Sequence, residues 1–264
     1  MKTAATNYWQ MTTRNILPCI FLLFLLTGCG RGGGTVRHGN LSYNATEVFG
    51  AGTSGLILAE AAGRGDVKTI NRQIAAGVNV NTVGKYDITP LWWAAWADNY
   101  EGFSALLDKG ANPNAQRSDR YPIMNLIASK EDSRFLAAAL KHGGNPNLRD
   151  NKSGVPPLFP SVMRGYKKNI DLLLAAKADV NWQDSISGET LPIIAIQARG
   201  DYELVYKFLE IGADPTLKDR FGHTLADTIE IVSKNASNND DPWRAKVLEV
   251  LRSKGMTVSK PASK

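Results

Sequence analysis

The chain has 264 residues, of which 43% are hydrophobic and 21% are charged. Its 31 lysines and arginines exceed its 25 acidic residues, which gives a formal net charge of +6 at pH 7. This excess is too mild to indicate nucleic-acid binding, so nucleic acid is excluded from the expected partners.

The first expected element is a secretory signal. Arg14 precedes a mostly apolar run, residues 16–26, which is too short to span a bilayer comfortably but suits a signal-peptide core. Residues 26–29, Leu-Thr-Gly-Cys, resemble the bacterial lipobox. The resemblance implies that residues 1–28 are a lipoprotein signal peptide and that acylated Cys29 anchors the chain to a membrane. The alternative is an ordinary signal peptide, or an N-terminal anchor helix, with an incidental cysteine.

The region around the cysteine also indicates a destination. Met11 gives a more typical start, which would make residues 1–10 an upstream extension. In lipoproteins of enterobacteria-like systems, Asp after the acylated cysteine retains the protein in the inner membrane. Gly30 stands there, so the resemblance implies an outer-membrane lipoprotein that faces the periplasm. Residues 29–54 are expected to be the acylated cysteine and a flexible tether, because they show no periodicity. The mature chain should hold no disulfide, since Cys19 leaves with the signal.

A short phrase recurs along the rest of the chain. It opens with glycine in four of its five copies and closes with asparagine in four of them. The closing residues are spaced by 33, 33, 34 and 35 positions, a period that indicates stacked repeats rather than one globular core. The five copies are residues 77–81, 110–114, 143–147, 177–181 and 212–216.

Each phrase follows a helical pattern. In residues 101–109 and 202–210, apolar side chains recur on one face of a helix. The glycine that follows suits a left-handed backbone after the last turn, because it lacks Cβ. A shorter helix is expected upstream, in the clearest unit at residues 89–96, where Thr89 suits the N-cap and Pro90 suits the first turn.

Thr89-Pro90-Leu91 and the recurring phrases resemble the ankyrin repeat. The resemblance implies an all-α fold, an ankyrin-repeat solenoid of about six helix–turn–helix units with short hairpin turns, over residues 55–255. Residues 256–264 are expected to be a disordered tail. The family's signature histidine never occurs, which indicates an apolar substitute at the same contact. Its place is taken by Trp92, Met124, Phe159 and Ile194.

The sixth unit is longer than the others. Its excess is a polar loop, residues 233–242, between its two helices. Asp241 before Pro242 restarts a helix that runs through Leu251. The pair Asp240-Asp241 has a metal site as an alternative, but an N-cap within a polar loop is favoured.

No catalytic pattern stands out. The chain has three histidines, and His142 falls at a helix end, where the helix dipole favours a capping role over a general base. No metalloprotease, nucleophile-elbow or phosphate-loop motif occurs. We therefore expect a protein that is not an enzyme, with no cofactor, no bound metal and no small-molecule substrate.

The ankyrin resemblance implies that partners contact the hairpin tips and the exposed face of each first helix. Trp93 and Trp96 point about 300° apart around their helix, so one of them is expected near the surface. The alternative is that these tryptophans, with Trp92, fill gaps in the core. An acidic partner is expected to meet a basic stripe, with a solvated charged face as the alternative; the stripe is formed by Arg117, Arg120, Lys152 and Arg164. The expected partner-binding residues are Lys85, Tyr86, Trp93, Trp96, Arg117, Arg120, Lys152 and Arg164.

These features together predict a membrane-anchored periplasmic module that binds another protein. Ankyrin lipoproteins of this kind resemble immunity partners of type VI secretion lipase effectors, which act on phospholipids in the periplasm. The sequence therefore favours binding and neutralisation of a secreted phospholipase toxin. The alternative is an envelope scaffold or stress-protection protein with no toxin partner.

Overall fold

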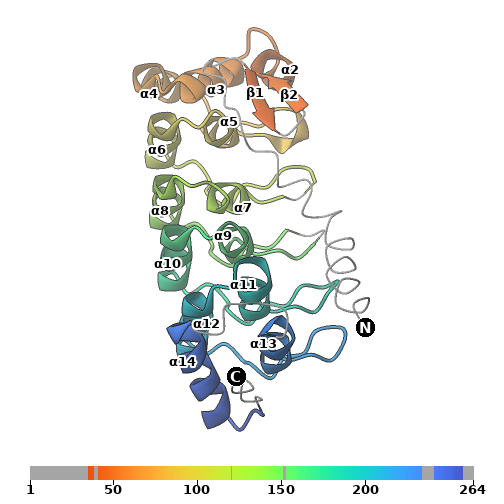
Figure 1. The fold of residues 1–264 in the computed structure, drawn as a ribbon. Coiled ribbons are helices and arrows are strands. Elements are labelled where there is room, and N and C mark those ends of the chain that lie inside the picture. The colour runs from red at the N-terminus through yellow and green to blue at the C-terminus, as the bar shows by residue number, and fades with distance from the viewer. Residues whose placement is uncertain (1–34, 39–40, 120, 151–152, 234–240, 258–264) are drawn as a thin grey trace. The chain divides into compact units, whose positions relative to one another are not determined.

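The structure is a computed structural model that describes residues 35–38, 41–119, 121–150, 153–233 and 241–257 (Figure 1). In these residues the chain is helical apart from one two-stranded sheet. It forms two compact units, residues 1–153 and 154–264. Each unit is built from helix pairs joined by turns, which confirms the predicted helix–turn–helix repeat architecture.

Unit 1 holds three helix pairs, and a short hairpin and helix precede them. First helices of successive pairs pack on one another, α3 on α5 and α5 on α7, and second helices do the same, α4 on α6 and α6 on α8 (Figure 1). Its elements are β1 Thr35–His38, β2 Leu41–Asn44, α2 Ala45–Phe49, α3 Ser54–Arg64, α4 Val67–Ala75, the 3-10 helix η1 Lys85–Asp87, α5 Pro90–Trp96, α6 Tyr100–Asp108, α7 Ile123–Ala128 and α8 Ser133–Lys141.

Unit 2 holds three further pairs. The first helices α9, α11 and α13 pack in that order, and α12 packs on α14. The unit's fully buried apolar side chains include Leu173, Val205 and Phe208, which lie on the second helices of its first two pairs. Its elements are α9 Leu158–Arg164, α10 Lys167–Ala175, α11 Leu191–Arg199, α12 Tyr202–Glu210, α13 Leu225–Ser233 and α14 Pro242–Ser253.

The helix starts follow the capping chemistry expected from the sequence. Thr89 Oγ1 accepts a hydrogen bond from the N–H of Trp92 at 3.3 Å, with Pro90 at the first helical position. Asp241 caps α14 by accepting from the N–H of Trp243 at 2.8 Å, which confirms its predicted role. A side-chain acceptor at this position satisfies one of the N–H groups that the first helical turn leaves without a partner.

The recurring phrase forms a turn whose backbone is left-handed at its first residue. Gly77, Gly110, Gly143 and Gly212 have φ between 85° and 100°, where a residue without Cβ is least strained. Lys177 holds the same place in the fourth copy with φ of 65°, so this repeat keeps the turn geometry without the glycine.

The closing asparagine of a phrase clamps the next phrase in the same unit. In unit 1, Asn114 Nδ2 donates to the carbonyl of Gly143 at 3.0 Å, and its Oδ1 accepts from the N–H of Asn145 at 2.7 Å. Asn81 bonds the phrase that begins at Gly110 in the same way. In unit 2, Asn181 makes the equivalent pair of bonds to Gly212 and Asp214. The copies that close at Asn81, Asn114 and Asn181 thus hold the following phrase in register.

Residues 35–49 differ from the prediction of a tether over residues 29–54. β1 pairs with β2 in antiparallel register, from Thr35 opposite Asn44 to His38 opposite Leu41. Asn44 then caps α2, whose residues Ala45, Val48 and Phe49 are buried. Periodicity missed this segment because each piece is only four or five residues long.

Several sequence predictions lie outside the described residues. They are the signal peptide at residues 1–28, acylated Cys29, most of the polar loop at residues 233–242, and most of the tail at residues 256–264. Among the helices of the described residues, none combines the length and hydropathy needed to cross a bilayer.

Candidate functional site

The tryptophans of α5 lie in the core of unit 1. Trp92 and Trp93 have no exposed surface, and Trp96 retains 3%. The expectation that Trp93 or Trp96 lies near the surface is therefore wrong, and the alternative that all three fill the core holds. Trp92, at the family's histidine position, packs at 5.3 Å from Trp96 and 6.3 Å from Tyr121, between ring centroids.

The N-terminal segment is the physical reason for this burial. The ring of Tyr43, at the end of β2, stacks on that of Trp96 with centroids 5.2 Å apart and planes 12° from parallel. Phe49, at the end of α2, meets Trp93 edge-on at 5.9 Å. Gly84 also approaches this segment closely, because a Cβ there would lie 2.5 Å from the carbonyl oxygen of Val48. Residues 35–49 thus cover the rings of both Trp93 and Trp96.

Arg117 is used inside this aromatic cluster and not in an exposed stripe. Its guanidinium carbon lies 5.6 Å from the ring centroids of both Trp92 and Trp96, a cation–π arrangement. The guanidinium also pairs with Asp119, and 14% of the Arg117 side chain is exposed. Burial alone would raise the pKa of Asp119, but the hydrogen bond and charge of Arg117 hold that pKa below its usual value. The structure therefore contradicts the prediction that Arg117 faces a partner.

The tip of the second repeat is open to solvent, as predicted. Lys85 and Tyr86 belong to η1 and are exposed, Tyr86 by 60%. Tyr86 and Asp87 have φ of 61° and 56°, a left-handed conformation that is costly for residues with Cβ. The tip is held to the following loop by the N–H of Ser118, which donates to the Tyr86 carbonyl at 3.0 Å. Lys85 and Tyr86 thus form a strained and accessible tip.

Of the remaining predicted site residues, the structure describes Arg164 alone. Arg164 is half-buried in the last turn of α9 in unit 2. Arg120, Lys152 and Cys29 lie outside the described residues. Of the predicted partner-binding residues, Lys85 and Tyr86 lie together on one exposed tip. Trp93 and Trp96 lie in the core, and Arg117 packs against the aromatic cluster.

Unit 2 presents an apolar surface that the sequence reading missed. Ile186 is 54% exposed and Phe221 is 52% exposed, on the hairpin tips of two successive repeats. A signal was available, because large apolar residues are unusual in the polar turns Ser185–Gly188 and Arg220–Gly222.

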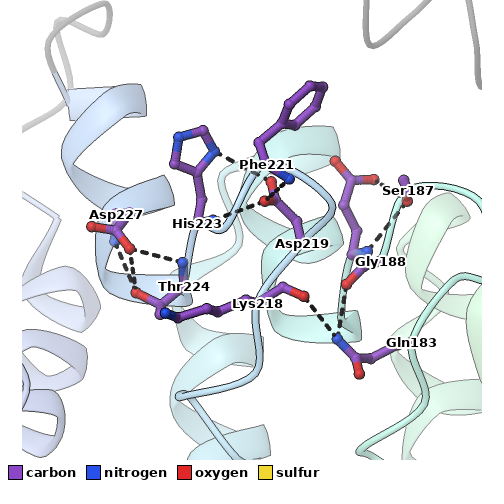
Figure 2. A network of polar contacts seen from close by, with 10 residues as sticks. Gln183, Ser187, Gly188, Lys218, Asp219, Phe221, His223, Thr224 and Asp227 are labelled. Atoms are coloured by element: carbon purple, nitrogen blue, oxygen red, sulfur yellow. Dashed lines mark hydrogen bonds and ion pairs between the residues drawn. The ribbon is translucent and has the colours of Figure 1, made fainter.

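A dense polar network holds these two tips together (Figure 2). The N–H of Arg220 donates to the Ser187 carbonyl at 2.9 Å. Gln183 Nε2 donates to the carbonyls of Gly188 and Lys218, at 3.0 and 3.2 Å, and so joins the two loops. A Cβ at Gly188, whose φ is 69°, would lie 3.0 Å from the Arg220 nitrogen, so glycine permits this approach.

An aspartate side chain stabilises the backbone of each tip. Asp219, 6% exposed, accepts from the N–H groups of Phe221 and His223, both at 2.8 Å (Figure 2). His223 Nδ1 also lies 3.4 Å from its Oδ2. Asp184 accepts from the N–H groups of Ile186 and Ser187, at 3.2 and 2.7 Å. Both loops are preorganised by these hydrogen bonds between an aspartate side chain and nearby backbone N–H groups.

Glu189 is a residue of this network whose pKa is raised. Burial raises the pKa of Glu189, and the negative charges of Asp219 and Asp184 raise it further, against hydrogen bonds with Ser187 and Gln197 that lower it. The residue is 5% exposed. Both desolvation and the nearby like charges therefore disfavour its ionised form.

The chemistry of the surface is that of recognition. Across the described ranges, no group of three or more His, Cys, Asp or Glu side chains is placed to hold a metal ion. His142 lies at the C-terminus of α8, with Nε2 3.2 Å from Asp108 Oδ1, which agrees with a capping role. The exposed tips offer apolar, aromatic and cationic side chains on rigid loops.

Comparison with known proteins agrees with this architecture. Residues 86–118 match the family model described as Ankyrin repeat. The chain is 33% identical over 144 residues to Protein PhlB of Serratia liquefaciens, an alignment that covers 54% of this chain and 63% of PhlB. It is 27% identical to the putative ankyrin repeat protein YahD of Escherichia coli (strain K12), over 62% of this chain and 83% of YahD.

A solved structure shows the same fold. The crystal structure of EF0377, an ankyrin repeat protein, superposes with a TM-score of 0.60 at 26% sequence identity. The match covers 74% of this chain and 96% of EF0377. This chain spans less than two thirds of PhlB. Residues 86–118 thus match one ankyrin repeat, and the fold is that of an ankyrin-repeat solenoid, a scaffold for protein–protein interaction.

Proposed function

We propose that this protein is a membrane-anchored periplasmic interaction module that binds and neutralises a secreted phospholipase toxin. The observation that carries the proposal is the ankyrin stack with rigid, solvent-exposed hairpin tips, downstream of a lipobox-like sequence that ends at Cys29. A stack of this kind offers an extended surface for another protein.

The physical rationale is that a binder needs proximity to its target's site of action. A phospholipase toxin acts at the membrane surface, and an acylated Cys29 would hold the repeats close to that surface. A short tether also raises the effective concentration of the binder there, so a modest affinity suffices. Occlusion of the toxin's active site would then protect the cell.

The test is a competition between siblings. Deletion mutants are mixed with the secreting parent, and their survival is compared with that of cells complemented by the wild-type chain or by Cys29→Ser. We expect the deletion mutant to be killed, the wild-type chain to protect, and Cys29→Ser to protect poorly because it lacks the anchor. Metabolic labelling with a fatty-acid analogue checks the chemistry, with label on the wild-type chain and none on Cys29→Ser.

Two outcomes would contradict the proposal. Deletion mutants that survive the parent as well as wild type would rule out immunity. Label that persists on Cys29→Ser would rule out lipidation at this cysteine. A growth defect of the mutant under envelope stress, without any attacker, would instead support the scaffold role.

A further inference from the structure

The paired tips of unit 2 stand out among the exposed surfaces. Ile186 and Phe221 are each more than half exposed, and they occupy consecutive repeats. The Arg220–Ser187 bond joins the residue that precedes Phe221 to the residue that follows Ile186. The two apolar side chains are therefore carried by loops that are hydrogen-bonded to each other.

Rigidity makes this exposure useful for binding. The backbone of each tip is fixed by an aspartate, Asp184 in one and the buried Asp219 in the other. Gln183 bridges both loops (Figure 2). A surface that is already ordered loses little conformational entropy when a partner docks. Exposed apolar side chains on flexible loops would lose more conformational entropy on binding.

The charge of the surface indicates what the partner carries. The carboxylates of Glu189 and Asp219 are buried, whereas Arg220 and Lys218 are exposed. The Arg220 guanidinium carbon lies 4.7 Å from the centroid of the Phe221 ring. Among the described residues, no carboxylate lies within ion-pair distance of Arg220, so its charge is available at the edge of the apolar patch.

We propose that Ile186, Phe221 and Arg220 form a docking surface for a protein segment that presents an apolar side chain beside an Asp or Glu. The apolar side chain would pack on Phe221 and Ile186, and the carboxylate would pair with Arg220. A guanidinium stacked on the ring places a strong hydrogen-bond donor at the contact, which suits a carboxylate better than lipid chains. The inference rests on the proposed function only in that the partner is a protein.

The test is photocrosslinking in intact cells with the full chain. A photoreactive benzoyl group is introduced as Phe221→p-benzoylphenylalanine, and the matched control is Ile211→p-benzoylphenylalanine, since Ile211 is 48% exposed in the same unit. We expect one dominant protein adduct from position 221 and none from position 211. Mass spectrometry of the crosslinked peptide should find Asp or Glu next to an apolar residue.

Charge variants test the role of Arg220. Arg220→Glu should reduce the adduct from position 221 by roughly tenfold, and Arg220→Lys should retain most of it. Thermal melts monitored by circular dichroism confirm that both variants fold. An adduct that is unchanged by Arg220→Glu, equal yields at positions 221 and 211, or a crosslinked peptide without an acidic residue would each overturn the inference.

The remaining outcomes separate this inference from the function proposed above. An adduct with phospholipid instead of protein would overturn the docking surface in favour of a membrane contact. An adduct with an envelope protein that is not a secreted toxin, in the absence of any attacker, would support the docking surface and favour the scaffold role over immunity. Protection in the sibling competition without any adduct at position 221 would leave immunity intact and refute this surface.

Discussion

Glu189 shows how one residue connects the sequence, the tip geometry and pH. It precedes Thr190, the N-cap residue of α11, and its backbone carbonyl accepts from the N–H of Asp184 at 2.9 Å. The turn therefore fixes the backbone, and the side chain is buried as a consequence. Its pKa is raised by burial first and by Asp219 and Asp184 next, so ionised Glu189 costs the folded state free energy.

Glu189→Gln is expected to stabilise unit 2 near neutral pH. The folded pKa is raised above the unfolded value, taken as 4.5, so stability is lost as pH rises from the unfolded pKa through the folded one. A neutral amide removes that loss, and we expect a gain on the order of 1 kcal/mol in the free energy of unfolding at pH 7. The gain should shrink as pH falls towards the unfolded pKa of the carboxyl.

Urea unfolding at a series of pH values measures this gain. The control is Glu210→Gln, because Glu210 is exposed at the end of α12. We expect the control to leave the free energy of unfolding nearly unchanged. A Glu189→Gln variant that is less stable than wild type at neutral pH would show that the carboxylate is needed in its charged form.

At the scale of the element, the phrase that closes each repeat is a connector between neighbours. Asn114 uses its amide N–H to donate to one residue of the next phrase and its amide oxygen to accept from another. Only an amide side chain offers a donor and an acceptor in this geometry. Thr216 ends the last phrase, and its hydroxyl bonds within its own turn, to Asp214 Oδ1 at 2.6 Å.

Asn114→Ala is expected to destabilise unit 1 by about 1–3 kcal/mol, since both inter-repeat hydrogen bonds are lost. Asn114→Asp should be at least as harmful at neutral pH, because a carboxylate oxygen would face the Gly143 carbonyl. Thr216→Ala is the matched control and should cost about half of this or less. Equal losses for Asn114→Ala and Thr216→Ala in denaturant melts would contradict the clamp.

At the scale of the whole molecule, residues that precede a stack of repeats can add a covering layer to it. In unit 1 this is done by residues 35–49, which bring Tyr43 and Phe49 onto Trp96 and Trp93. The cover buries aromatic surface that would otherwise be exposed as an apolar patch. Residues that precede the repeats are therefore part of the folded unit.

Removal of residues 30–49 is expected to lower the free energy of unfolding by at least about 3 kcal/mol, because large buried aromatic contacts are lost. Tryptophan fluorescence should shift to the red as Trp93 and Trp96 meet water. A chain that lacks only residues 30–34 is the control and should melt as wild type does. Unchanged fluorescence and stability after the longer deletion would show that residues 35–49 do not cover α5.

Much of the fold could be predicted from the sequence, and the failures have physical causes. The period, the caps at Thr89 and Asp241, and the glycine turns depend on local chemistry, which the sequence displays directly. Burial of Trp93 and Trp96 depends on a non-periodic segment that returns to α5. An angle of about 300° between two side chains does not decide exposure when a further layer covers the helix.

The candidate surface was predictable only in part. Exposure of Lys85 and Tyr86 follows from their place at a hairpin tip. The inward orientation of the Arg117 side chain does not follow from its place in the sequence. Its cation–π contacts form only once the fold brings Trp92 and Trp96 beside it. The docking surface of Ile186 and Phe221 required knowledge of which loops bond to each other.

The asparagine clamp also has a direction. Each clamping asparagine acts on the phrase that comes later in the chain, as Asn81 does for the phrase at Gly110 and Asn181 for the phrase at Gly212. A repeat therefore finds its turn template in a predecessor that has already been synthesised, and each of these clamps can close as soon as the later phrase emerges. A growing or translocating chain could thus fold vectorially from its first repeat onward, each turn setting before the next helix pair emerges.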